Sequence, residues 1–187
     1  MIVLGIDPGT ATTGYGVVRG DGAGSFALIE CGVIRTRPRE PLALRLRAIH
    51  AGVTELIERH RPDALAVEDV FYSRNVRTTV VLGHARGVVL LAGALAGVEV
   101  HEYPPAEIKK AVTGTGAATK EQVQFMLTRL LRLRSAPQPA DASDGVAAAV
   151  TCVMTAGIRR MLGEARFPAA SSAAAGRARV APMRGDL

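Results

Sequence analysis

The spacing of apolar residues changes along the chain, and this change predicts which segments are strands and which are helices. Some segments contain short continuous apolar runs bounded by turn residues, which is typical of buried strands. Others repeat apolar residues every three to four positions, which predicts amphipathic helices. The expected strands are 2–6, 13–19, 25–34, 64–68 and 98–103, and the expected helices are 41–60, 77–96, 105–112, 119–133 and 141–162.

The order of these segments predicts an α/β fold. Three successive strands with short connections favour an antiparallel meander, and the later strands alternate with helices. We therefore expect one domain over residues 1–164, with a mixed five-stranded sheet flanked by helices in the order βββαβαβα. Residues 165–187 are rich in Ala, Ser and Arg without periodicity, so we expect a flexible tail there.

Composition narrows the class of protein. With 187 residues, 48% hydrophobic and 21% charged, the chain is large and apolar enough to form a core, which excludes global disorder. The N-terminus lacks the basic region of a signal peptide, and no continuous apolar run reaches the ~18 residues of a membrane helix. Cys31 and Cys152 lie far apart in apolar surroundings, which favours free thiols. We therefore expect a cytoplasmic protein without a membrane partner.

The net charge of +6 indicates an anionic partner, and nucleic acid is the usual one. The distribution of this charge is uneven, because residues 157–187 carry a net +4 and residues 1–156 only +2. The placement of particular side chains is therefore more informative than the total.

Four acidic residues occupy informative positions. Asp7 ends the first strand, Glu68 ends the fourth, and Asp141 and Asp144 open the last helix on one face. If strands one and four are neighbours and that helix crosses their ends, the four acids meet. Three of the four also have a simpler explanation: Asp7 could form a turn, Asp141 could be an N-cap, and Asp144 could be an acid that interacts with the helix dipole. Glu68 is the hardest to explain this way, because it closes an apolar strand.

A cluster of four acids requires compensating charge. Two like charges ~4 Å apart repel by ~4 kcal/mol at an effective dielectric constant of ~20. Oxygen ligands select hard divalent cations such as Mg²⁺ or Mn²⁺. Two such ions can activate water and stabilise the leaving oxygen of a phosphodiester. The acids and the basic chain together therefore predict metal-dependent phosphodiester hydrolysis.

The positions of the lysines also agree with phosphodiester chemistry. The chain has 20 Arg but only three Lys, all within twelve residues, at Lys109, Lys110 and Lys120. A compact ammonium suits a phosphate oxygen near metals, so Lys109 and Lys120 are candidates, while Lys110 is expected to point elsewhere. The alternative is that Lys109 and Lys110 are solvated helix residues.

The loop after Glu68 contains the other candidate for nucleic-acid contact. An exposed aromatic side chain beside basic residues can stack on an unpaired base. The alternative is that Phe71 continues the strand into the core. The candidate DNA-contacting residues of this segment are Phe71, Tyr72, Arg74, Asn75 and Arg77.

Five segments together resemble the RuvC family of Holliday-junction resolvases. They occur in the family's order and cover roughly residues 1–160, which makes the set specific although each motif alone is modest. The segments are GIDPGTATTGYGVV (5–18), AVEDVFYSRN (66–75), LGHARGV (82–88), YPPAEIKKAVTGTGAATKEQVQ (103–124) and ADASDGVAAAV (140–150).

The resemblance implies a ribonuclease H-like fold and a homodimer that resolves four-way DNA junctions by paired, symmetric nicks. It implies two Mg²⁺ per subunit, with Mn²⁺ as a substitute, and cooperation with the RuvA–RuvB branch-migration complex. Carried over by position, it makes the four acids named above the metal ligands and catalytic carboxylates. It makes Lys109 and Lys120 catalytic-site lysines and Phe71 an aromatic that enters the junction near its crossover.

Two neighbours of the presumed ligands are unusual. Asp69 adds an acid, but strand alternation should turn it away from Glu68. Gly145 costs ~1 kcal/mol inside a helix relative to Ala, and only a closely packed neighbouring element would account for it.

Three other functions compete with this interpretation. The segment from Asp7 to Gly14 also resembles the phosphate-binding hairpin of sugar kinases and actin-like ATPases, but a second such hairpin is missing. A nuclease of the same fold acting on structured RNA is a nearer alternative. A binding protein that holds junctions without cutting is the third, and the presence of all four acids argues against it.

Overall fold

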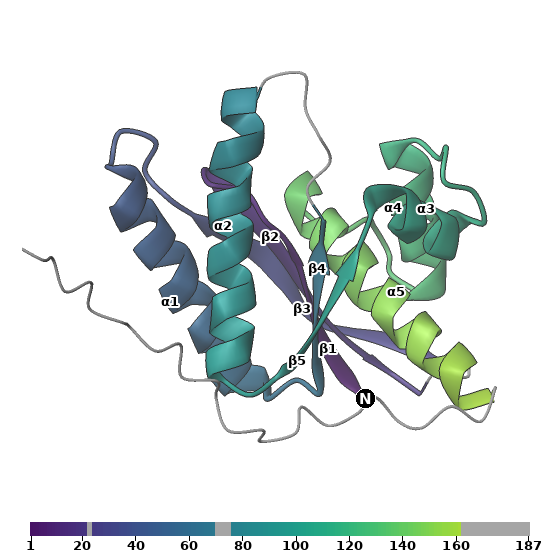
Figure 1. The fold of residues 1–187 in the computed structure, drawn as a ribbon. Coiled ribbons are helices and arrows are strands. Elements are labelled where there is room, and N and C mark those ends of the chain that lie inside the picture. The colour runs from purple at the N-terminus through teal and green to yellow at the C-terminus, as the bar shows by residue number, and fades with distance from the viewer. Residues whose placement is uncertain (22–23, 70–75, 162–187) are drawn as a thin grey trace, which may run out of the picture.

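The computed structural model describes residues 1–21, 24–69 and 76–161, and Figure 1 shows their fold. This part of the chain forms five strands and five helices in the order βββαβαβααα. The strands are β1 (Ile2–Asp7), β2 (Thr12–Gly20), β3 (Phe26–Arg35), β4 (Ala64–Glu68) and β5 (Glu99–Tyr103). The helices are α1 (Leu42–His60), α2 (Val76–Leu95), α3 (Pro105–Thr113), α4 (Lys120–Leu130) and α5 (Ala140–Met161).

The sheet confirms the predicted fold class. Its strand order is β3-β2-β1-β4-β5. Strand β2 pairs antiparallel with both β1 and β3, which makes the meander. Strand β4 pairs parallel with both β1 and β5. Strands β1 and β4 are adjacent, as the placement of the acids required. Because these two strands run in the same direction, Asp7 and Glu68 end at the same edge of the sheet, which we call the carboxyl edge.

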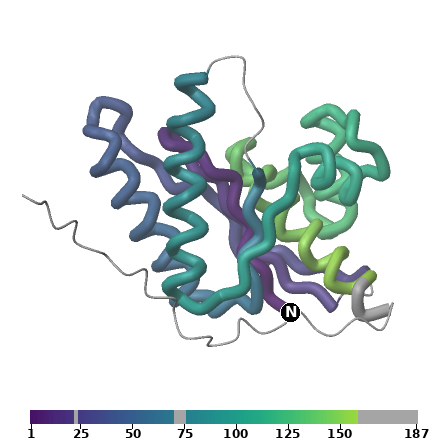
Figure 2. Tube along the Cα trace, viewed as in Figure 1, coloured from purple at the N-terminus to yellow at the C-terminus, as the bar shows by residue number. Residues whose placement is uncertain are grey.

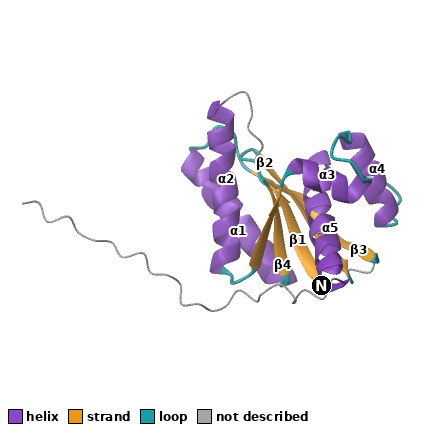
Figure 3. Ribbon diagram, turned by 45° about the vertical axis from the view of Figure 1, so that its right-hand side comes forward, coloured by secondary structure: helices purple, strands orange, loops and turns teal. Residues whose placement is uncertain are grey.

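Helices cover both faces of the sheet. Figure 3 shows α1 and α2 on one side and α3, α4 and α5 on the other. Side chains alternate between the two resulting cores: Val3 and Ala66 pack toward α5, whereas Leu4 and Leu65 pack toward α1 and α2. Figure 2 shows how the chain passes from β5 through α3 and α4 and then returns along the sheet as α5.

Helix α5 approaches the sheet backbone unusually closely, and this explains Gly145. A Cβ built on Gly145 would lie 2.6 Å from the Cα of Tyr15 on β2. On the facing strand, a Cβ on Gly14 would overlap the carbonyl oxygen of Asp141. The helix therefore packs by backbone contact, and the expectation of a closely packed neighbour is confirmed.

Element boundaries agree with the sequence interpretation except at α4. Its start is as expected, because the Thr119 hydroxyl accepts a hydrogen bond from the Gln122 amide and the Gln122 side chain accepts one from the Thr119 amide, forming a capping box. The predicted extension to residue 133 is wrong: α4 ends at Leu130, and Arg132 adopts a left-handed backbone conformation with φ of 53°. The apolar spacing continues past the helix because Leu131, the C-cap residue, and Leu133, beyond the left-handed Arg132, both pack against the core.

Helix α2 is the one helix among the described residues that is long and apolar enough to span a membrane by length and composition, with a mean hydropathy of 1.5. The sequence interpretation considered only uninterrupted apolar runs and did not single it out. One face of α2, with Ala85 and Val89, packs into the core beside α1 and the sheet. Outside this helix, Cys31 and Cys152 form no disulfide within the described ranges, as expected. The predicted tail, 165–187, lies outside the described residues.

Candidate active site

The carboxyl edge brings the four predicted acids into one electrostatic cluster. Asp7 and Glu68 are the last residues of neighbouring parallel strands. Asp141 and Asp144 lie in the first two turns of α5, which crosses β1 and β2 at close range. All four carboxylates are partly buried, and the charges of Asp7, Asp141 and Asp144 each raise the pKa of at least one other acid of the cluster. The structure thus brings together the four acids that the sequence places at two strand ends and at the start of the last helix.

The pKa values of the two strand-end acids show how crowded the cluster is. Burial raises the pKa of Asp7 to about 6, and the charges of Asp144 and Asp141 add to the effect. Burial also raises the pKa of Glu68 to about 8, helped by the charges of Asp7 and Asp144. Near neutral pH, a substantial fraction of Glu68 is therefore protonated unless positive charge enters the cluster.

Lys120 supplies part of the positive charge. As the first residue of α4 it directs its ammonium group to Asp144, with Nζ 2.6 Å from Oδ2. Burial lowers the pKa of Lys120, but the hydrogen bond to Asp144 and the charges of Asp144, Asp141 and Asp7 outweigh it and raise the pKa overall. Burial keeps the pKa of Asp144 above its ordinary value despite this partner. One lysine therefore does not neutralise the cluster.

Lys109 approaches the same cluster from α3. Its charge lowers the pKa of both Glu68 and Asp144, although less than burial raises either. The side chain is half-buried, whereas the neighbouring Lys110 is exposed. The two lysines that the sequence singled out thus approach the acids from different helices, and their different exposures agree with the expectation that Lys110 points elsewhere.

The composition of the cluster fits divalent cations. Its donors are all carboxylate oxygens, and the acids outnumber the lysines. A cation would therefore offset the burial and the acid–acid repulsion that together raise the pKa values of Asp7 and Glu68. In their present positions, no three His, Cys, Asp or Glu side chains of the described residues could already hold a metal ion.

The predicted DNA-contacting loop is described only at its end. Arg77 lies exposed as the second residue of α2. The other four residues of the set lie outside the described residues: Phe71, Tyr72, Arg74 and Asn75.

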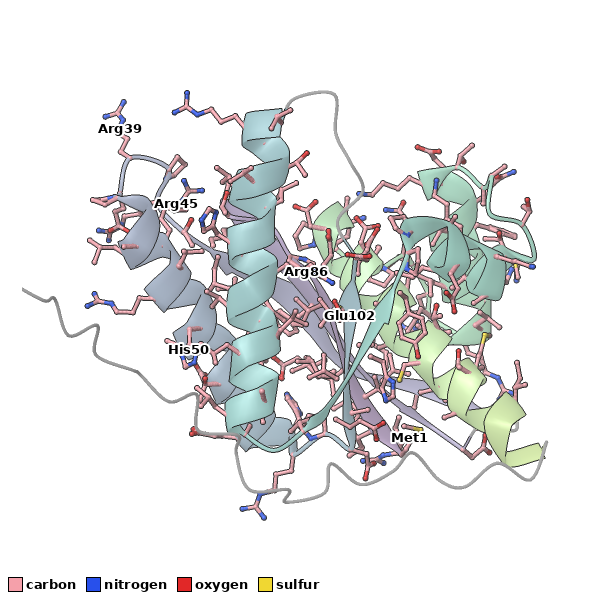
Figure 4. All side chains as sticks on the ribbon, in the orientation of Figure 1. Met1, Arg39, Arg45, His50, Arg86 and Glu102 are labelled. Atoms are coloured by element: carbon pink, nitrogen blue, oxygen red, sulfur yellow. The ribbon has the colours of Figure 1, made fainter. Side chains whose placement is uncertain are left out.

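A charged network beside the acids was not foreseen. Arg86 of α2 contacts Glu102 of β5, and its Nη2 lies 3.2 Å from Oδ1 of Asp69 (Figure 4). The Asp69 amide also donates a 2.9 Å hydrogen bond to the Tyr103 carbonyl. This network ties the ends of β4 and β5 to α2. Asp69 turns away from Glu68 as alternation predicted. The signal for Arg86 was a single charge in the middle of an otherwise apolar helix.

Comparison with known proteins identifies the family. Residues 3–152 match the family "Crossover junction endodeoxyribonuclease RuvC". Among curated proteins bearing that description, the one from Pelotomaculum thermopropionicum is 49% identical over 150 residues, covering 80% of this chain and 91% of the relative. The one from Rubrobacter xylanophilus is 51% identical over 149 residues, covering 80% and 83%.

Solved structures agree with this match. The structure described as T. thermophilus RuvC in complex with Holliday junction substrate superposes with a TM-score of 0.80 at 41% identity, covering 84% of this chain and 96% of that one. The yeast mitochondrial Holliday junction resolvase Ydc2, at 11% identity and a TM-score of 0.62, shares the fold. A nuclease of this family uses a divalent metal, which agrees with the donor set at the carboxyl edge. The chain belongs to the RuvC family of crossover junction endodeoxyribonucleases, and it is a Holliday-junction resolvase that acts on DNA.

Proposed function

We propose that the protein binds a four-way DNA junction as a homodimer and makes paired, symmetric nicks by metal-dependent hydrolysis at the carboxyl edge. The observation that carries this proposal is the electrostatic cluster of four carboxylates and two lysines, which come from five elements of the chain: β1, β4, α3, α4 and α5. The acids Asp7, Glu68, Asp141 and Asp144 hold two Mg²⁺ ions in each subunit, and Mn²⁺ substitutes. When bound, these ions supply an activated water and stabilise the departing 3′ oxygen, which leaves 5′-phosphate and 3′-hydroxyl ends.

The side chains of the site manage charge and protons during this reaction. Burial and the neighbouring acids raise the pKa values of Asp7 and Glu68, and a divalent cation held there would lower both values and favour the carboxylate forms. Lys120, which donates a hydrogen bond to Asp144 in this structure, would also donate to the scissile phosphate as the negative charge on that phosphate increases. Lys109 neutralises the same charge from α3 and keeps the local potential from becoming more negative.

The segment after Glu68 selects the branched substrate. We propose that Phe71 enters the junction near its crossover, where bases are easiest to unstack, and that Tyr72 supports it. Arg74, Asn75 and Arg77 contact the adjoining backbone. These contacts distinguish a junction from a continuous duplex, in which every base is stacked.

Dimerisation is proposed to use the exposed face of α2. Val80, Leu91 and Leu95 are all more than half exposed, and Gly83 and Gly87 between them have open space beside their Cα atoms. These positions recur at helical spacing, so they form one apolar stripe on which a second copy can pack. A two-fold axis through this stripe gives two active sites for two strands of like polarity. The RuvA–RuvB complex is the proposed partner that delivers the junction.

The test uses a synthetic four-way junction and a linear duplex of the same sequence, each with Mg²⁺ and with EDTA. We expect symmetric nicking of the junction alone, and only with Mg²⁺. Asp7→Asn should lower the nicking rate by about 10³-fold or more, because a metal contributes several kcal/mol to the transition state. It should leave junction binding unchanged. Glu58→Gln, an exposed acid of α1, is the matched control. Wild-type rates for Asp7→Asn, or equal cutting of the duplex, would contradict the proposal.

A further inference from the structure

A dense arginine segment follows the third strand. Five of the thirteen residues from 35 to 47 are arginine, and the segment has a single acid, Glu40. It comprises the end of β3, the connection to α1 and the first turns of that helix. The arginines are Arg35, Arg37, Arg39, Arg45 and Arg47. The functions assigned above do not use any of them.

Hydrogen bonds fix this arginine segment to the turn that follows Asp7. The Thr36 amide donates to the Ala11 carbonyl at 3.1 Å, and the Thr36 hydroxyl donates to the Thr10 carbonyl at 2.5 Å. Arg45 Nε in turn donates to the Thr36 hydroxyl at 3.1 Å. The basic segment and the strand end that carries Asp7 are therefore parts of one hydrogen-bonded edge.

The spacing places the segment within reach of DNA held at the acids. Thr10 is three positions after Asp7 in the sequence, which is at most about 11 Å of extended chain. A duplex carries one charge per ~1.7 Å of its axis, so about six phosphates pass over that length. A duplex arm that leaves a scissile phosphate at Asp7 in the direction of β2 and β3 would therefore pass over the arginine segment. Figure 4 shows Arg39 and Arg45 at the N-terminal end of α1.

Most of the arginines are available for such contacts. Arg35, Arg39 and Arg47 are exposed, and within the described ranges none of the three forms an ion pair with an acid. Arg37 pairs with Glu40 at 3.5 Å, but its side chain remains 86% exposed. Such an exposed pair contributes little and opens at small cost when a phosphate competes for the guanidinium.

We infer that residues 35–47 form a second DNA-binding surface, which contacts the phosphate backbone of a duplex arm beside the cleavage site. Planar guanidinium groups suit bidentate contact with phosphate oxygens. The contact is independent of base sequence, so it holds the arm rather than selecting where it is cut. An acidic protein surface is the competing partner, but only DNA must lie at this edge during the reaction. The inference rests on the resolvase function.

The experiment compares two double variants that remove the same charge. Arg39→Gln with Arg47→Gln alters the arginine segment. Arg19→Gln with Arg61→Gln is the matched control, because Arg19 lies at the other end of β2 and Arg61 follows the other end of α1, about 28 Å away by helix rise. Affinity for the four-way junction is measured over a series of salt concentrations. Each lost phosphate contact should reduce the slope of log K against log salt by about 0.9.

We expect the first pair to lower that slope by about 2 and the control pair to leave it unchanged. Arg39→Lys with Arg47→Lys should restore most of the slope, because the charge returns. Single-turnover nicking on saturating junction should stay within about twofold of wild type in all three. An unchanged slope for the Arg39 and Arg47 pair, or an equal loss of slope in the control pair, would overturn the inference. It would also be overturned if the first pair weakened binding of an acidic protein without weakening DNA binding. Absence of nicking by wild-type protein would instead refute the proposed function, while the slope would still decide this inference.

Discussion

The two faces of the sheet are packed in different ways. Toward α5, β1 and β2 present glycines, and the helix backbone lies directly on the strand backbone, as the contact between Gly145 and Tyr15 shows. Toward α1 and α2 the same strands present large side chains, such as Leu4 and Ile6, which fill the space between the layers. One interface is made by main chain and the other by interlocking apolar side chains.

This difference determines what each face can do. Side chains adjust by changing rotamers, so a helix on the α1 and α2 face can shift by fractions of an ångström. A backbone contact has no such freedom, so the position of α5 relative to β1 is fixed. Asp141 and Asp144 reach the strand-end acids from that fixed helix. The chemistry thus lies on the rigid face, while α2 offers its outer surface for association.

The largest expected effect comes from breaking the backbone contact. Gly145→Ala introduces a Cβ 2.6 Å from the Cα of Tyr15, which main chain must move to accommodate. We expect a loss of about 3 kcal/mol in unfolding free energy, and a fall in Tm of about 6–12 °C. Nicking should fall by more than tenfold even where the variant remains folded, because the acids of α5 shift with the helix. Thermal unfolding and single-turnover cleavage measure the two effects.

Gly83→Ala is the control for this variant. A Cβ at Gly83 meets nothing within 4 Å, so the substitution should leave Tm unchanged or raise it slightly through helix propensity. If Gly145→Ala unfolds at the wild-type temperature and cuts normally, then α5 can adjust and the two faces do not differ as described.

The sequence predicted the elements of the fold better than the contacts between them. Strands, helices and the acids at their ends are encoded locally, which is why Asp7 and Glu68 could be assigned to strand ends from the sequence. That they share one edge depended on β1 and β4 being neighbours, which the structure confirms. Gly145 was flagged as costly in a helix, but its partner Tyr15 follows only from the register of β2. The contact of Arg86 with Asp69 likewise depends on how α2 lies across β4 and β5, which no local pattern specifies.

A smaller expected effect concerns how Glu68, at the carboxyl edge, makes the stability of the fold depend on pH. Burial and neighbouring acids raise the pKa of Glu68 to about 8 in the absence of metal. The native state therefore binds more protons than the unfolded state between pH ~4.5 and ~8, so stability falls as pH rises through that window. Glu68→Gln removes this cost. In EDTA at pH 8 it should raise unfolding stability by about 2 kcal/mol, or Tm by roughly 4–8 °C, and flatten the pH dependence.

Mg²⁺ and a matched variant separate this effect from general changes in charge. Saturating Mg²⁺ should stabilise the wild-type protein at pH 8 more than at pH 5, and should stabilise Glu68→Gln less than wild type. Glu58→Gln, an exposed acid of α1, should leave the pH profile unchanged. A wild-type Tm in EDTA that rises from pH 5 to pH 8 would show that the acids on this face do not repel one another as the pKa values of Asp7 and Glu68 indicate.

The smallest expected effect lies on the opposite face, where α2 presents its apolar stripe. Leu91 is 51% exposed, so replacing it should not disturb the core, but Leu91→Glu would place two like charges close together across a two-fold axis. We expect dimer affinity to fall about tenfold, equivalent to about 1.4 kcal/mol, with little change in monomer Tm. Phe125→Glu on α4, where Phe125 is 57% exposed, is the matched control and should not affect association. Sedimentation equilibrium measures both. If the control weakens the dimer and Leu91→Glu does not, the association surface lies on the same side of the sheet as the acids, and the division of roles between the two faces is wrong.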